Sequence, residues 1–354
     1  MEKENRKECE KMRYTPEKKP RRRIRPLPVI IVLIILILAI IAVYFINIFA
    51  KLNHRELNGE QLGITSSAAV IDDGDHESII NIALFGVDQR EGETKFRSDA
   101  VMVLTVDKSR NKIKLSSLMR DSLVSIDGYG KNKLAHAYFY GGPQLAVKTL
   151  NENFGLDIKE YVTVNFQEMA QMIDAVGGVE IDISEEERIA ANGSIKEQSI
   201  VAGLPEDYIQ KSGLQTLNGT QAVAYARIRK VGNGDFERTD RQREVLQKIF
   251  NKAIKMNPVQ YPELARKFLP LVETSLDWGE IMNLAGMATR NLTFEDVRFP
   301  LISDLIGNGS IWINNNTEQC VNLDVEATGE HMRQFIYDDV NPAKPVSNTS
   351  SALK

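Results

Sequence analysis

An uncharged run over residues 27–50, rich in isoleucine, leucine, valine and alanine, restricts the possible folds of this chain more than any other feature. About 20 apolar residues cross a bilayer as a helix. A cleaved signal peptide has an apolar region of only about 7–15 residues and a small-residue cleavage site. Here the run is longer and passes into Lys51 without such a site. We therefore expect an uncleaved transmembrane helix over residues 27–50.

Positive charge is concentrated before this run. Residues 1–25 hold eleven Lys or Arg and five Glu, a net charge of +6, whereas the whole chain carries −4. Because cytoplasmic flanks are rich in Lys and Arg, residues 1–26 are expected in the cytoplasm, in contact with membrane lipid, and the C-terminal part outside the cell. The chain is thus expected to be a single-pass protein of the cell membrane. Its acidic body argues against a nucleic-acid partner, because like charge repels phosphate backbones.

The pattern after residue 50 predicts an α/β protein, an α-β-α layered sandwich with a mixed central sheet preceded by one transmembrane helix. Residues 51–78 are polar and small and are expected to form an extracellular stalk, residues 79–340 one domain, and residues 341–354 a tail. Residues 184–216 are expected to form a long surface excursion. The expected strands are 79–87, 100–106, 113–118, 161–164 and 179–183, and the expected helices are 142–153, 166–175 and 239–256.

Charged side chains are expected to meet at one edge of this sheet. The first three strands are joined by short loops, which favours an up-down-up meander. The end of the first strand, the start of the second and the end of the third then lie together. These points hold Asp88, Arg90, Arg97, Asp99, Arg120 and Asp121. Carboxylates are oxygen ligands suited to Mg²⁺, with Mn²⁺ as an alternative, and the arginine fork suits phosphate. The sequence therefore predicts a site for a substrate with adjacent phosphates.

Five stretches of the chain, in order, resemble the motif series of the LytR-CpsA-Psr family. They are NIALFGVDQR, RSDAVMVL, LMRDSLVSI with KLAHAYFYGG, MIDAVGGVEI, and LNGTQAVAYARIRK with GDFERTDRQREVL. The resemblance implies that residues 79–340 are a catalytic domain. It implies a metal-dependent phosphotransferase that attaches an anionic glycopolymer, such as teichoic acid or capsule, to peptidoglycan by phosphodiester formation. The polymer would come from an undecaprenyl-pyrophosphate carrier.

The same resemblance implies roles for individual residues. Asp88 and Asp99 would hold Mg²⁺ (or Mn²⁺). Asp99, Arg120 and Arg227 would be catalytic, with Asp99 or Asp88 as the general base. The pyrophosphate oxygens would be bound by Arg97, Arg120, Arg227, Arg229, Arg238 and Gln242. Arg241 and Arg243 are expected to face solvent instead.

Structural explanations stand beside these functional ones. Asp88 and Asp99 are residues favoured in turns, and Arg227 and Arg229 suit a helix end. The apolar stretches 145–150 and 166–173, with the aromatic residues 138–140, are suited either to a slot for the polyprenyl chain or to an ordinary core. Two other functions also remain open: a lipid-pyrophosphate hydrolase with water as the attacking group, and a non-catalytic membrane-bound regulator that attenuates transcription.

Overall fold

The computed structural model describes residues 47, 49–64, 78–89, 95–202, 206–232, 234–287, 290–313 and 316–344. The chain divides into two compact units, Met1–Asn47 and Ile48–Lys354, and the second contains the strands and helices of the α/β fold. The predicted cytoplasmic segment and residues 27–46 and 48 of the predicted transmembrane helix lie outside the described residues. Within the described residues, no helix has both the length and the apolar character that a bilayer span requires.

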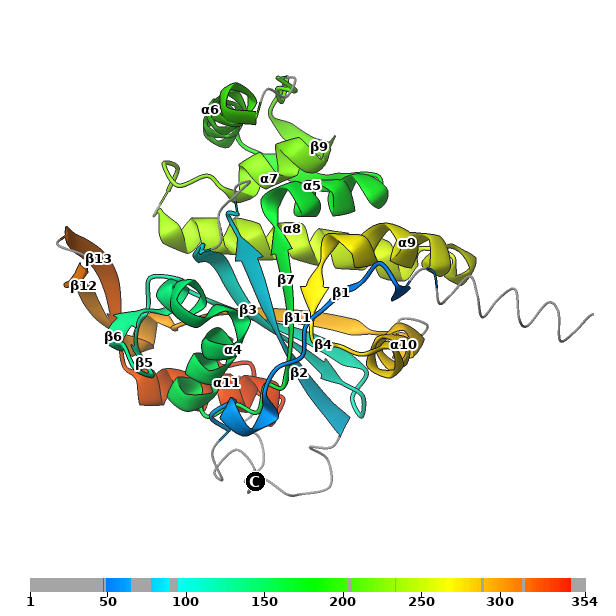
Figure 1. Cartoon of the computed structure of the whole chain (residues 1–354). Coiled ribbons are helices and arrows are strands. Elements are labelled where there is room, and N and C mark those ends of the chain that lie inside the picture. Colours follow the sequence, from blue (N-terminus) through cyan, green and yellow to red (C-terminus); the bar gives the residue numbers. More distant parts are fainter. Residues whose placement is uncertain are drawn as a thin grey trace, which may run out of the picture. The chain divides into compact units, whose positions relative to one another are not determined.

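The centre of the unit is a seven-stranded sheet in the order β1-β10-β7-β2-β3-β4-β11 (Figure 1). β3 pairs antiparallel with both β2 and β4, whereas β7 runs parallel to β2 and β11 parallel to β4. The sheet is therefore mixed and contains the up-down-up meander, as predicted. Its strands are β1 (Asn53–His54), β2 (Ile79–Val87), β3 (Ser98–Asp107), β4 (Lys112–Leu118), β7 (Glu160–Asn165), β10 (Glu273–Thr274) and β11 (Thr293–Phe299).

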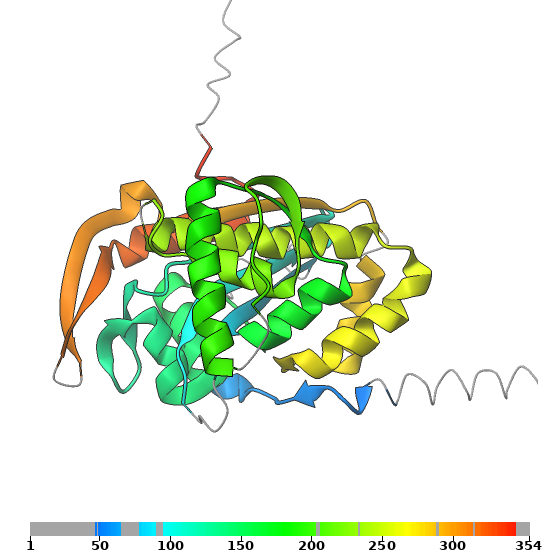
Figure 2. The same cartoon turned by 90° about the horizontal axis from the view of Figure 1, so that it is seen from above.

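Helices cover both faces of this sheet, because its central strands carry apolar side chains on both sides (Figures 1 and 2). On one face, Ala83 and Phe85 of β2 share a buried core with residues of α4 (Leu134–Phe154) and α11 (Val325–Ile336). On the other face lie α5 (Phe166–Ala175), α7 (Gly219–Ala226) and α8 (Asp235–Lys255). Peripheral helices are α6 (Glu185–Ala202), α9 (Tyr261–Phe268), α10 (Trp278–Met287), η2 (Gly59–Gln61), η4 (Pro258–Gln260), η5 (Leu269–Leu271) and η6 (Ile302–Asp304).

Three two-stranded sheets extend the unit. They are β5 (Leu123–Ile126) with β6 (Gly130–Lys133), β8 (Val179–Ile183) with β9 (Gly213–Leu217), and β12 (Leu305–Ile313) with β13 (Asn316–Leu323). Each pair is antiparallel. The β12–β13 hairpin extends from the end of the unit where α8 begins, in both views (Figures 1 and 2).

The structure differs from the sequence-based expectation in two segments. Residues 185–202, expected within a surface excursion, form helix α6. The predicted stalk begins inside the fold, because β1 pairs with β10 and Leu62 is only 3% exposed in the main core. This packing could not be predicted from the polar sequence of the segment, because a two-residue strand and one buried leucine produce no periodic pattern. Residues 65–77 of the predicted stalk lie outside the described residues.

Candidate functional site

A β-bulge brings the two predicted metal ligands to the same edge of the sheet. Gly86 pairs with Ala100, but Val87 pairs with Ser98, so Asp99 is an extra residue in β3. Such bulges redirect the side chain of the inserted residue and are frequent beside active sites. Asp88 directly follows Val87. The pairing therefore puts Asp88 and Asp99 at adjacent positions on neighbouring strands.

Guanidinium groups from two other segments meet these carboxylates. Arg120, just after β4, donates from Nη1 to Asp99 Oδ1. Arg227 Nη2 lies 3.2 Å from Asp88 Oδ2, and Arg229 Nη2 lies 3.8 Å from Asp99 Oδ2. The predicted convergence of these five residues is therefore present in the fold, while their catalytic roles stay predictions.

Local sequence positions Arg227. Helix α7 begins with a capping box, in which the Asn218 side chain accepts from the Gln221 backbone amide and the Gln221 side chain accepts from the Asn218 backbone amide. The helix is short and ends at Arg227, whose guanidinium carbon lies 4.6 Å from the centre of the Phe166 ring. Arg227 thus contacts an aromatic ring as well as the carboxylate edge.

Arg238, in the first turns of α8, is buried without enough partners. Its side chain is 3% exposed, and Nη1 lies 2.9 Å from Asp235 Oδ1 without forming a hydrogen bond. Within the described residues, Nε and Nη1 of Arg238 and Nε of Arg120 have no hydrogen-bond acceptor. Burial, and then the nearby guanidinium of Arg120, lowers the pKa of Arg238 to about 10. Buried donors without acceptors are costly, so this cluster is suited to an anionic ligand.

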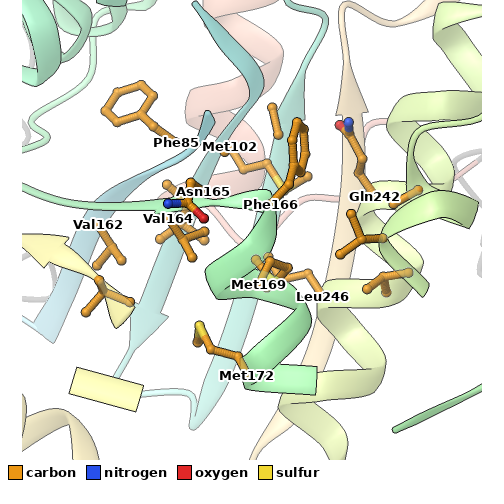
Figure 3. A pocket seen from close by; sticks show the side chains of 17 residues that line it. Phe85, Met102, Val162, Val164, Asn165, Phe166, Met169, Met172, Gln242 and Leu246 are labelled. Carbon is orange, nitrogen blue, oxygen red and sulfur yellow. The ribbon is translucent and has the colours of Figure 1, made fainter. Parts of the chain in front are cut away.

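Two predicted ligands of the pyrophosphate lie elsewhere. Arg97 is 46% exposed, and its Nη2 lies 3.2 Å from Glu318 Oε1 of β13, so its ion pair is with the hairpin. Gln242, one turn after Arg238 on α8, lines an apolar cavity (Figure 3). Arg90 lies outside the described residues.

That cavity has a volume of about 230 Å³ and lies between the sheet and helices α5, α7 and α8 (Figure 3). Its lining is apolar except for Asn165 and Gln242. The lining residues are Leu84, Phe85, Gly86, Ala100, Met102, Val162, Val164, Asn165, Phe166, Met169, Met172, Val223, Ala226, Gln242, Val245, Leu246 and Val272. Because Ala100 follows Asp99 and Ala226 precedes Arg227, the cavity adjoins the charged edge.

Of the segments weighed for a lipid slot, 138–140, 145–150 and 166–173, only 166–173 borders this cavity. Phe166 and Met169 of α5 line it, whereas Tyr138 of α4 is buried in the main core on the opposite face of the sheet. Tyr138 donates to, or accepts from, Thr163 at 3.0 Å. The structure therefore separates two segments that hydrophobicity alone could not distinguish.

Sequence reasoning missed several residues around the site. Lys133 Nζ lies 3.1 Å from Asp121 Oδ1 and 3.0 Å from Glu318 Oε2. Burial would raise the pKa of Asp121, but Arg120 and Lys133 reverse this effect and lower it. Lys133 belongs to the stretch KLAHAYFYGG, which resembles a family motif. This resemblance could have identified Lys133 from the sequence. Glu318 lies outside all the motifs.

The expectation that Arg241 and Arg243 face solvent is wrong. Arg243 is only 15% exposed and its Nε lies 2.7 Å from Asp296 Oδ2, and Arg241 is a buried structural residue. Its guanidinium is 2.8 Å from Glu187 Oε1 and 3.1 Å from Glu237 Oε2, and it also donates to the backbone oxygens of Ile228 and Val231. These carbonyls belong to the segment that carries Arg229. Arg241 therefore fixes the loop on which the site depends.

Asp88 and Asp99 are suited to a divalent cation only if a bound phosphate substrate supplies further oxygen ligands. No cluster of three or more His, Cys, Asp or Glu side chains that could hold a metal is found in the described part of the chain. Mg²⁺ is commonly held by one or two carboxylates plus substrate phosphates and water. Asp88 and Asp99 match that pattern, but both also contact arginines.

A model of the LytR_cpsA_psr family matches residues 46–328. This chain belongs to that family. It is 33% identical over 272 residues to the polyisoprenyl-teichoic acid–peptidoglycan teichoic acid transferase TagU of Oceanobacillus iheyensis, covering 72% of this chain and 77% of TagU. It is 29% identical over 262 residues to the regulatory protein MsrR of Staphylococcus aureus, covering 73% of this chain and 75% of MsrR.

The fold agrees with that membership in the LytR-CpsA-Psr family. The chain resembles the solved structure of the family protein YwtF (TagT) of Bacillus subtilis with bound octaprenyl pyrophosphate lipid. The TM-score is 0.53 at 22% identity, and the match covers 74% of this chain and 92% of that chain. At this identity the likeness concerns the fold.

The two buried arginines of α8 should respond oppositely to substitution. Arg238→Met should leave the free energy of unfolding unchanged or raise it by about 1 kcal/mol, because Nε and Nη1 of the buried guanidinium lack hydrogen-bond acceptors. Arg241→Met should lower it by about 3–5 kcal/mol, because it leaves Glu187 and two carbonyls unpaired. Urea denaturation of the full chain in detergent measures both. Equal destabilisation by the two variants would make Arg238 a structural residue.

The fold should lose stability in acid through His136. Burial, followed by the Arg97 guanidinium, lowers the pKa of this residue to about 4, and its Nδ1 is 2.6 Å from Asn132 Oδ1. An unfolded histidine has a pKa of about 6.5. As the pH falls from 6.5 to 4, the unfolded state gains a proton that the folded state does not, which removes about 3 kcal/mol of stability.

Urea denaturation at several pH values across this window checks the prediction. His136→Gln should flatten the dependence between pH 6.5 and 4. An unchanged slope in the variant would assign the acid sensitivity to other groups.

Proposed function

We propose that this protein is a metal-dependent phosphotransferase that attaches an anionic glycopolymer from an undecaprenyl-pyrophosphate carrier to peptidoglycan. One observation carries the proposal: buried guanidinium donors without acceptors adjoin an apolar cavity. A polyprenyl pyrophosphate combines an anionic head with an apolar tail and matches both parts. The name of TagU and the lipid bound to TagT support the same substrate class.

The pyrophosphate head would bind among the arginines. Arg120 and Arg238 have free donors, and Arg227 and Arg229 lie beside the two carboxylates. Arginine forks bind phosphate oxygens strongly and with defined geometry. Arg97 would join them on release from Glu318. The first isoprene units would occupy the cavity beside Phe166, and its volume of about 230 Å³ leaves the rest of the chain to the membrane.

A divalent cation, Mg²⁺ or Mn²⁺, would be held by Asp88 and Asp99 and would supply charge stabilisation at the phosphate oxygens. Two carboxylates alone are too few ligands for such a cation. We therefore expect the cation to bind together with the lipid pyrophosphate, whose oxygens would complete its coordination.

Transfer would proceed by direct displacement at phosphorus. A hydroxyl oxygen of a peptidoglycan sugar bonds to the sugar-proximal phosphorus, the bond from that phosphorus to the bridging oxygen breaks, and undecaprenyl phosphate leaves with the bridging oxygen. The hydroxyl proton would pass to Asp99, or to Asp88. Charge develops on oxygens around phosphorus, so the arginines would contribute by position and electrostatics.

The proposal includes the arrangement in the membrane. Residues 27–50 would anchor the protein as a single-pass signal anchor with the N-terminus in the cytoplasm, and the α/β unit would act on the outer face. Membrane lipid and the lipid-linked polymer would then be its partners on the same side as peptidoglycan. A lipid-pyrophosphate hydrolase remains the competing activity for the same residues.

Arg120→Ala should reduce glycopolymer transfer by the full-length protein about 100- to 1,000-fold, because one charge-stabilising group is removed. The assay supplies polyprenyl-pyrophosphate-linked polymer and peptidoglycan and follows coupled product. Arg290→Ala is the matched control, since Arg290 is exposed before β11, at the opposite edge. Wild-type transfer by Arg120→Ala would remove this residue from the mechanism. Release of polymer without acceptor would favour the hydrolase.

Removal of divalent cations should stop transfer by the wild-type protein, and added Mg²⁺ or Mn²⁺ should restore it. Asp88→Asn should need a higher metal concentration for half-maximal transfer, because one charged ligand is lost. Undiminished transfer in excess chelator would exclude the metal while leaving the transferase proposal intact.

A further inference from the structure

The β12–β13 hairpin is unusual in its lack of charge. Residues 305–323 contain a single charged residue, Glu318, although 26% of the whole chain is charged. The same segment holds five asparagines, one glutamine and a tryptophan. Surface segments usually carry many charges. The hairpin therefore exposes mainly amides, hydroxyls and one indole, besides Ile306 at 73% exposure, and differs chemically from the rest of the surface.

One face of the hairpin gathers these groups. Side chains two residues apart on a strand share a face, so Asn308, Ser310 and Trp312 of β12 lie on the same side. Ser310 pairs with Gln319 and Trp312 with Thr317, which puts both β13 residues on that face too. All five are exposed, and Trp312 is 70% exposed.

The side chains of this face indicate which kind of ligand it can bind. Amides and hydroxyls both donate and accept hydrogen bonds, and an indole ring offers a flat apolar surface. Anionic polymers and anionic lipid headgroups are bound by cations, and this face has none. An uncharged sugar chain with hydroxyl and N-acetyl groups is complementary to it.

Glu318, on the opposite face of the hairpin, and the backbone at Val321 fix the hairpin to the charged edge of the sheet. Glu318 is 3.2 Å from Arg97 and 3.0 Å from Lys133, and Lys133 is 3.1 Å from Asp121. The Val321 backbone amide donates to the Asp121 carbonyl at 2.9 Å. Asp121 directly follows Arg120. The hairpin is thus attached to the strand end that carries a site arginine, near the start of α8 (Figures 1 and 2).

We propose that the exposed face of the β12–β13 hairpin, formed by Asn308, Ser310, Trp312, Thr317 and Gln319, binds the uncharged N-acetylhexosamine chain of the acceptor. Glu318 holds this face beside the site at which phosphoryl transfer would occur. The inference rests on the proposed function for the identity of the acceptor, but the binding itself can be measured separately.

The test measures binding of a soluble β-1,4-linked N-acetylglucosamine oligomer to the full-length protein in detergent by calorimetry. Trp312→Ala should weaken binding about 10-fold, because the stacking surface is lost, and Trp312→Phe should restore most of it. Val259→Ala is the control, since Val259 is 83% exposed on η4 and should leave binding unchanged.

The same variants are then compared in the transfer assay. Trp312→Ala should raise the KM for acceptor about 10-fold while kcat and the affinity for a prenyl pyrophosphate stay at wild-type values. Equal oligomer affinity in wild type and Trp312→Ala overturns the hairpin site, as does binding of acceptor through its peptide alone. Oligomer binding that depends on Trp312 in a protein without transfer activity would overturn the proposed function and support the hairpin site.

Discussion

The antiparallel pairing of β2 with β3, interrupted by the bulge at Asp99, is the constraint on which the rest of the site depends. Regular pairing would bring Asp99 opposite Val87 and turn its side chain to the other face. The extra residue keeps Asp99 within reach of Arg120 and Arg229. Asp99 lies within β3 and Asp88 directly follows β2, so the paired strands position both carboxylates of the edge.

Around this edge the fold holds like charges close together. Arg120, Arg229 and Arg238 come from three separate segments, and burial of Arg120 and Arg238 removes water that would otherwise screen the repulsion between them. The carboxylates of Asp99 and Asp121 offset part of this cost, since they outweigh burial and raise the pKa of Arg120. Donors without acceptors remain, and such incomplete pairing is expected where a ligand supplies the missing charge. This cluster therefore contributes less to the free energy of unfolding than it would if every guanidinium donor had an acceptor.

Much of the fold followed from local pattern. Strand β8 and helix α5 occur at the residues predicted, because apolar spacing and the Asn165–Glu168 capping box are local features. The short loops joining β2, β3 and β4 predicted the meander, and with it the meeting of Asp88, Asp99 and Arg120. Helix α6 was not predicted, since its polar sequence has weak periodicity and its stability comes from packing Ala191 and Ile195 into a separate apolar core that residues of β8 and α7 share.

The sequence by itself determined the α/β class, the meander of β2, β3 and β4 and the residue types at the edge, because these depend on periodicity and on short connections. Only the tertiary structure decided which partners those residues have. It assigned Arg97 to Glu318, buried Arg241 under the Arg229 loop, and left Nε and Nη1 of Arg238 without hydrogen-bond acceptors. Each of these outcomes depends on contacts between segments far apart in the chain, whose distances no local pattern encodes.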